Sequence, residues 1–156
     1  PQPQPKPQPW RNELAHYEWV ELYISLQDGP STQAEPVDLE GKISTDALVN
    51  INQSAWALAY QYPVHTITSE NADAIEAQPT FLVVYQEPTS SEVQFLQTTG
   101  LVVHLLNLLE QHEGLSFTAL INVLTQAPIN QTREHAEKFL LDALTDLLAK
   151  GVIKVR

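Results

Sequence analysis

The chain has 156 residues, which is enough to bury one hydrophobic core, and its formal net charge is −11. It contains no cysteine, which excludes disulfides, thiolate metal sites and a cysteine nucleophile. No apolar run reaches the roughly 18 residues that span a bilayer, and no segment reads as a signal peptide, so we expect a cytoplasmic protein without membrane contact.

The charge is uneven along the chain. Residues 1–79 carry 3 Lys or Arg against 11 Asp or Glu, and residues 80–156 carry 5 against 8. The average field of such a chain repels a polyanion, so nucleic acid is not an expected partner unless a local basic patch exists. Methionine is absent as well, and we therefore expect the C-terminal domain of a longer protein whose N-terminal domain is missing here.

The first eleven residues differ in composition from the rest. Pro1–Pro9 alternates proline with Gln or Lys, which predicts an extended, solvated linker over residues 1–11. Residues 12–156 are then expected to form a single α+β domain.

A helix is predicted over Asn12–Leu26, with Asn12 as its N-cap. Its apolar residues cover more than one stripe, and we expect the helix to pack on two neighbours, one of which could belong to the missing part of the protein. These residues are Leu14, Ala15, Tyr17, Trp19, Val20, Leu22, Tyr23 and Leu26.

Residues 28–42 are rich in Gly, Pro and acids and are expected to form a loop. Residues 47–60 show an alternation of period two that predicts short strands, with helix as the competing interpretation for 53–60. Val64–Ile67 is predicted to be another short strand, and Ser69–Gln78 an acidic loop or a single helical turn.

The centre of the chain predicts a β-hairpin. Phe81–Tyr85 is rich in β-branched and aromatic residues, Glu87–Ser91 supplies turn residues, and Val93–Gln97 forms the return strand. Thr98 or Thr99 can then cap a helix. The apolar residues of this helix are Leu101, Val102, Leu105, Leu106, Leu108 and Leu109.

Two more helices and a strand follow. Ser116 is expected to cap a helix that Pro128 ends, and Asn130 or Thr132 caps the most clearly amphipathic helix of the chain. Val152–Val155 is a predicted terminal strand. A small antiparallel sheet with a hairpin followed by three helices, over residues 80–156, is typical of a winged helix or of a recognition element that binds ribosomally made precursor peptides.

The sequence predicts no catalytic residues, no cofactor and no metal site. Of its five histidines, His104 and His112 lie on one predicted helix about two turns, ~12 Å, apart, which is too far for one ion, and His16, His65 and His135 lie in other elements. No metalloprotease, phosphate-binding, dinucleotide-binding or nucleophile-elbow motif is present, so we do not expect an enzyme.

The helices do not form a basic face. The second of the three predicted helices has no charged residue, and the third mixes both signs, which is unlike a DNA recognition helix. A strand edge of the hairpin could instead accept an extended peptide, with Phe81, Val83 and Tyr85 as candidate partner-binding residues. Leu82 and Val84 lie on the opposite face of the same strand, and one of the two sets must face the core.

Four segments carry a resemblance to the HvfC-like family, whose members were first described as DNA-binding or transcription-regulatory proteins of a neisserial type. These segments are Glu13–Leu22, Tyr60–His65, Pro79–Tyr85 and Glu92–Leu96. The resemblance implies an accessory subunit of a multinuclear non-heme iron oxidase, which helps to present a precursor peptide whose cysteines are modified. The iron ligands would belong to the partner enzyme. Gln86 stands where the family usually has a basic residue, which weakens any anion-binding role there.

The sequence therefore predicts a non-catalytic adaptor, or peptide-recognition domain, whose partners are an iron-dependent oxidase and its precursor peptide. The alternative is a DNA-binding regulator whose DNA-binding surface lies in the missing N-terminal domain. A third interpretation is a structural domain that only packs on that missing half. The sequence does not indicate an oligomeric state.

Overall fold

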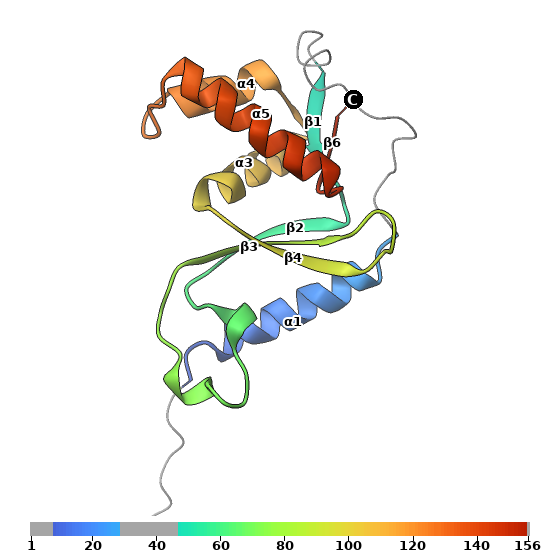
Figure 1. Cartoon of the computed structure of the whole chain (residues 1–156), viewed down its shortest axis with the longest axis vertical. Coiled ribbons are helices and arrows are strands. Elements are labelled where there is room, and N and C mark those ends of the chain that lie inside the picture. Colours follow the sequence, from blue (N-terminus) through green and yellow to red (C-terminus); the bar gives the residue numbers. More distant parts are fainter. Residues whose placement is uncertain (1–7, 29–46, 156) are drawn as a thin grey trace, which may run out of the picture.

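The computed structural model describes residues 8–28 and 47–155 (Figure 1). In chain order its elements are α1 (Arg11–Ser25), β1 (Leu48–Ile51), β2 (Ala55–Tyr60), the short 3-10 helices η1 (Val64–Thr66) and η2 (Ala72–Ala74), β3 (Thr80–Gln86), β4 (Val93–Thr98), α3 (Gly100–Gln111), β5 (Leu115–Ser116), α4 (Phe117–Thr125), α5 (Arg133–Ala149) and β6 (Ile153–Val155). The α+β class is confirmed, as is the hairpin followed by three helices.

The described strands form two antiparallel sheets of three strands each, with the orders β2-β3-β4 and β5-β1-β6. In the first sheet β2 extends the predicted hairpin, so the strand interpretation of residues 55–60 is confirmed over the helical one. In the second sheet β1 pairs with both β5 and β6. Neither β5 nor a second sheet was predicted from the sequence.

The β2-β3-β4 sheet is covered on both faces (Figure 1). Leu82 and Val84 of β3 face α1, where they pack with Val20 and Ile24 in a small core. Val83 of the same strand faces the opposite way, into the larger core. Alternate residues of a strand point to opposite faces, and the unbroken apolar run of β3 therefore fills both cores.

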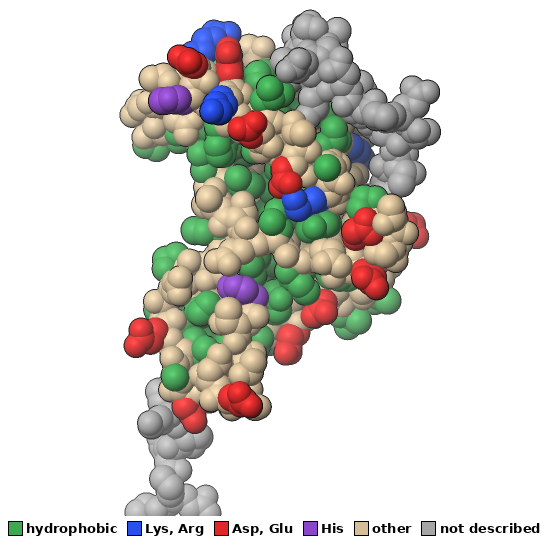
Figure 2. Space-filling model, viewed as in Figure 1, with side chains coloured by type: hydrophobic (Ala, Val, Ile, Leu, Met, Phe, Trp, Pro, Cys, Tyr) green, Lys and Arg blue, Asp and Glu red, His purple; other side chains and the backbone are tan. Residues whose placement is uncertain are grey.

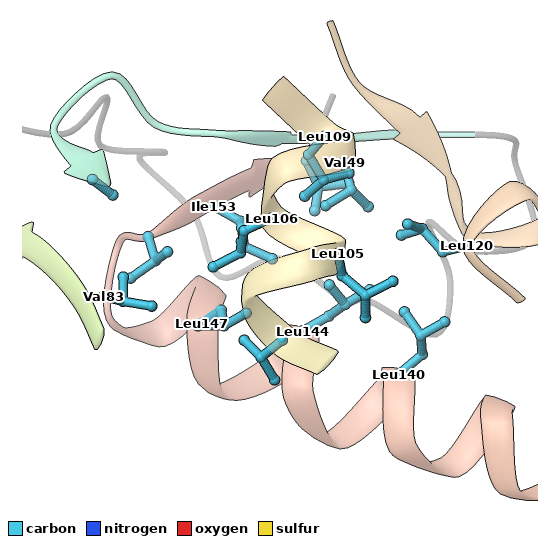
Figure 3. Packing of buried hydrophobic residues seen from close by; sticks show 14 of the residues in the cluster. Val49, Val83, Leu105, Leu106, Leu109, Leu120, Leu140, Leu144, Leu147 and Ile153 are labelled. Atoms are coloured by element: carbon cyan, nitrogen blue, oxygen red, sulfur yellow. The ribbon is translucent and has the colours of Figure 1, made fainter. Parts of the chain in front are cut away.

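The larger core lies between the sheet and the three C-terminal helices. Figure 3 shows leucines of α3 and α5 directed toward one another and toward Val49 of β1 and Ile153 of β6. The residues at its centre are almost fully buried, among them Leu106, Leu109, Leu120, Leu124 and Leu140.

The three C-terminal helices begin at three of the predicted caps. The hydroxyls of Thr99, Ser116 and Thr132 each accept a hydrogen bond from the backbone N–H of the third residue of the helix, in α3, α4 and α5 respectively. Thr99 and Thr132 are thus the capping residues among the alternatives that the sequence offered. The succession α3, β5, α4, α5, β6 is that of a winged helix, with β1 as the strand between β5 and β6.

Two local predictions are wrong. Asn12 does not cap α1, because the helix begins at Arg11 and its N-cap, Trp10, is buried and makes no side-chain cap hydrogen bond. Val64–Ile67 is not a strand, because the chain makes a turn of 3-10 helix after Pro63. Residues 69–78 were predicted to be an acidic loop or a single helical turn, and they contain one turn of 3-10 helix, η2. All of the predicted loop 28–42 after residue 28, and most of the proline-rich linker, lie outside the described residues.

Candidate functional site

The strand that carries Phe81, Val83 and Tyr85 is β3, the central strand of its sheet. It pairs with β2 on one side and with β4 on the other. Val83 and Tyr85 are buried in the larger core, and Phe81 is half-buried. The prediction that these residues form a free strand edge is therefore wrong, because two neighbouring strands already bond to the backbone on both sides.

The outer edge of the hairpin is formed by β4 instead. The N–H of Glu87 donates to the carbonyl of Glu92 at 2.8 Å. This hydrogen bond shows which residues of β4 bond to β3 and which do not. In an antiparallel pair every second residue bonds to the partner strand. The other residues of β4 direct their N–H and C=O groups away from β3, and these are Val93, Phe95 and Gln97. Among the described residues, none of these outward groups has a backbone hydrogen-bond partner.

The side chains of β4 do not protect this edge. Val93–Thr98 contains neither a charged residue nor a proline, which are the usual devices that keep an edge strand from pairing with another chain. Phe95 is 37% exposed, and its ring centroid lies 4.9 Å from that of Tyr17 on α1. The two rings provide an apolar platform beside the open backbone.

Tyr17 stays neutral beside this edge over the physiological range. Burial and the nearby carboxylate of Glu21 raise the pKa of Tyr17 to about 12. The side chain therefore offers an uncharged hydroxyl and a ring face, and α1 forms one wall along the strand.

The opposite edge of the sheet, β2, is less accessible. The N–H of Ala55 already donates to the carbonyl of Asn52 at 3.1 Å, and Ala55 is buried. The residues of β2 that share the face of Ala55 are alanines as well, and α3 packs close to this strand. Of the two edges, β4 is therefore the one that offers both free backbone and exposed apolar side chains.

Helix α1 is fastened to the sheet by residues from two of the segments that carry the family resemblance. The Glu13 carboxylate accepts hydrogen bonds from the N–H groups of Gln61 and Tyr62 at 2.9–3.0 Å. One turn further, Nδ1 of His16 lies 2.8 Å from the Tyr60 hydroxyl. The Glu13–Leu22 and Tyr60–His65 segments thus contact each other, and their polar residues hold α1 in place.

Gln86 is buried and does not form an anion site at the hairpin turn. Its amide nitrogen donates to the carbonyls of Ile24 and Gln27, at the C-terminal end of α1. Its oxygen is buried and has no hydrogen-bond partner among the residues that the structure describes. A residue with donors at this position complements the partial negative charge of a helix C-terminus, so the role of Gln86 is to fasten α1 rather than to bind a ligand.

The hairpin turn is ordered by Glu87. Its carboxylate accepts hydrogen bonds from the hydroxyls of Thr89 and Ser90, each at 2.7 Å, and from their backbone N–H groups. These bonds lower the pKa of Glu87 to about 2. The turn therefore holds β4 in a fixed register on β3.

The described residues contain no group of three or more His, Cys, Asp or Glu side chains that could hold a metal ion. His104 and His112 lie on α3 and just after it, and His16 is engaged with Tyr60. Within this part of the chain, no helix is long and apolar enough to cross a membrane.

The surface is mainly acidic. On the face shown in Figure 2, Asp and Glu side chains are spread over most of the molecule, and the few Lys and Arg side chains lie on the half that holds α4 and α5, from its top to near the middle of the molecule. There Arg133 pairs with Glu137, and Lys150 pairs with Asp146. These helices do not present a continuous basic face to a phosphate backbone.

A family model described as the HvfC C-terminal domain matches residues 52–148. The match begins just before β2 and ends near the C-terminus of α5, so it includes the hairpin, the β4 edge and the three helices. No curated protein matches the chain.

Proposed function

The chain belongs to the HvfC C-terminal domain family, and from this we propose that it is a non-catalytic adaptor that partners an iron-dependent, peptide-modifying oxidase and presents its precursor peptide. The resemblance to the family implies that the iron and its ligands belong to the oxidase. The outer edge of β4, unprotected by charge or proline, is the observation in this chain that carries the proposal.

In this proposal a segment of the precursor peptide adds to the sheet as a fourth strand. The N–H and C=O groups of Val93, Phe95 and Gln97 would supply the main-chain hydrogen bonds, which give affinity without reading sequence. Alternate peptide side chains would meet the rings of Phe95 and Tyr17, which favour an apolar residue there. The adaptor would thus hold one segment rigidly and leave the adjoining segment free to reach the oxidase.

The structure allows this edge to be closed without disturbing the fold. Gln97 directs its N–H away from β3, and its side chain is exposed. Gln97→Pro removes that outward donor and keeps the ladder to β3, because proline is tolerated on the free side of an edge strand. Gln97→Ala retains the donor and is the matched control.

The test is affinity capture with the wild-type chain and both variants immobilised in parallel. Lysate of the source organism is passed over each at low and moderate salt, and the retained molecules are identified by mass spectrometry and nucleic-acid staining. We expect the wild type and Gln97→Ala to retain a small cysteine-containing peptide and an iron-containing oxidase, and Gln97→Pro to lose the peptide. Retention of DNA in a salt-sensitive manner, with no protein partner, would contradict the adaptor and favour a regulator.

A further inference from the structure

Helix α1 carries a second apolar stripe that the sheet covers only in part, through Trp56 of β2. Its buried residues, Val20 and Ile24, face the sheet. On the opposite side Trp19, Leu22 and Leu26 are 50%, 58% and 76% exposed. Tyr23 is exposed beside them, and together these residues follow the i, i+3, i+4, i+7 spacing that places side chains on one helix face. We define these four residues as the α1 stripe.

The aromatic part of the stripe is held in a fixed arrangement. The rings of Trp19 and Tyr23 stack with their centroids 5.4 Å apart. Trp56 of β2 contacts both, at 5.7 Å from Trp19 and 4.9 Å from Tyr23. Trp and Tyr side chains held in advance lose little conformational entropy on binding, and they are the residues most often responsible for affinity at protein interfaces.

Acidic side chains flank the stripe on one side. At about 100° per residue, Glu18 and Glu21 lie between the stripe and Tyr17, and both are exposed. Asp28 is exposed just beyond the end of the helix. Among the described residues, neither of the two ion pairs involves these carboxylates, since both pairs lie on or at the end of α5.

We infer that the α1 stripe is a docking surface for a second protein that presents an apolar helix flanked by Lys or Arg. Charge complementarity selects this occupant, because basic flanks would pair with Glu18 and Glu21 while the apolar residues bury the stripe. A second copy of this chain would set the same acidic residues against one another across a two-fold axis. An anionic lipid surface would be repelled by the same carboxylates.

This surface differs from the outer edge of β4. Tyr17 and Phe95 meet on the β4 side of α1, whereas Trp19 and Tyr23 meet Trp56 on the β2 side. A protein bound at the stripe would therefore leave the β4 edge open, and the inference does not depend on the proposed peptide site.

The test uses two labelled synthetic helical peptides that share one leucine stripe, one with lysine and one with glutamate at the flanking positions. Binding to the full chain is measured by fluorescence anisotropy at low and moderate salt. We expect the lysine peptide to bind at least about tenfold more tightly than the glutamate peptide, and its affinity to fall as salt rises.

Leu22→Ser and Leu26→Ser should each weaken binding of the lysine peptide by about tenfold or more, because each removes a leucine from the contact. Both residues are exposed, so circular dichroism should show an unchanged fold. Leu48→Ser, at an exposed leucine of β1, and Gln97→Pro should leave binding unchanged.

Equal affinity for the two peptides, or unchanged binding by Leu22→Ser and Leu26→Ser, would overturn the inference. So would sedimentation that shows self-association of the chain lost in Leu22→Ser, which would assign the stripe to a second copy. Binding to phosphatidylserine-containing vesicles that is lost in the same variant would assign it to a membrane surface instead.

Discussion

Both carboxylate oxygens of Glu13 lie within 3.0 Å of the backbone nitrogen of Gln61, 48 positions further along the chain. Glu13 is in the first turn of α1, and Gln61 directly follows β2. The contact joins the helix that precedes the matched family domain to the sheet inside it. It also fixes the angle at which α1 crosses the sheet, and therefore the position of Tyr17 beside β4.

Glu13→Ala should lower the free energy of unfolding by about 1–3 kcal/mol, because it removes the charged acceptor that the N–H groups of Gln61 and Tyr62 share. Urea denaturation followed by tryptophan fluorescence measures the change. Glu18→Ala removes an exposed carboxylate from the same helix and should change stability by no more than about 0.5 kcal/mol. Equal stability of the two variants would show that the Glu13 contact does not fasten α1.

The stability of the α1–sheet contact should fall at alkaline pH. Burial and nearby Glu13 raise the pKa of Tyr60, and burial and Glu21 raise that of Tyr17 to about 12. A raised folded-state pKa gives stability that is fully present below the unfolded value near 10 and is lost as pH rises through the folded value. The midpoint of urea denaturation should fall as pH rises across that range. Tyr17→Phe should make this fall with pH less steep, while it keeps the ring beside Phe95. A slope that is the same in both proteins would contradict the assignment to Tyr17.

The carboxyl of Glu87 should titrate far below an ordinary glutamate, with a pKa of about 2. NMR titration of the side chain measures it directly, and Thr89→Val with Ser90→Ala should move the pKa toward 4.5 by removing two hydroxyl donors. Because the folded-state pKa is depressed, the contribution of this group to stability is present above the unfolded value and is lost as pH falls toward 2. An ordinary pKa in the wild-type chain would show that the turn is not ordered by this carboxylate.

Gln86→Leu should destabilise the chain by about 1–3 kcal/mol, because the carbonyl of Gln27 loses the donor that Gln86 supplies and the carbonyl of Ile24 keeps only backbone donors such as the N–H of Gln27. Gln86→Lys should retain more stability than Gln86→Leu, since an ammonium complements the C-terminal end of a helix. Chemical denaturation of the three proteins compares them. A leucine variant as stable as the wild type would show that these hydrogen bonds contribute no net stability.

The hairpin, its turn and the three helices could be predicted from the sequence because local signals determine them. Thr99, Ser116 and Thr132 sit at helix starts, and the apolar spacing of α3–α5 has the helical period. The composition of β3 also indicates its central position within the sheet. Its unbroken apolar run is typical of a strand buried on both faces, whereas β4, with Gln94 and Gln97, reads as an edge. This difference in composition predicts the free strand edge, and therefore the candidate site, at β4 and not at β3.

The second sheet could not be predicted, because it depends on contacts between distant parts of the chain. Asn52 donates from its side chain to the carbonyl of Gly151, and β1 pairs with β6 beside it, about a hundred positions away. Gly114 shows the same dependence, since a Cβ there would lie 2.4 Å from Oδ1 of Asn50. Neither contact leaves a local pattern in the sequence. Which apolar residues of α1 stay exposed likewise depends on how the helix packs on the sheet. The sequence indicated only that the apolar residues of this helix cover more than one stripe, and hence that it has a second neighbour.

Amide hydrogen exchange along β4 tests the central claim most directly. In the free chain the N–H groups of Val93, Phe95 and Gln97 should exchange rapidly, because they point away from β3, while those of Gln94 and Leu96 should be protected by the ladder. Addition of the peptide retained in the capture experiment should protect the first set and leave the second unchanged. Protection of the outward amides in the free chain, or no added protection with the peptide bound, would contradict the account that β4 is the open edge on which a precursor peptide is presented.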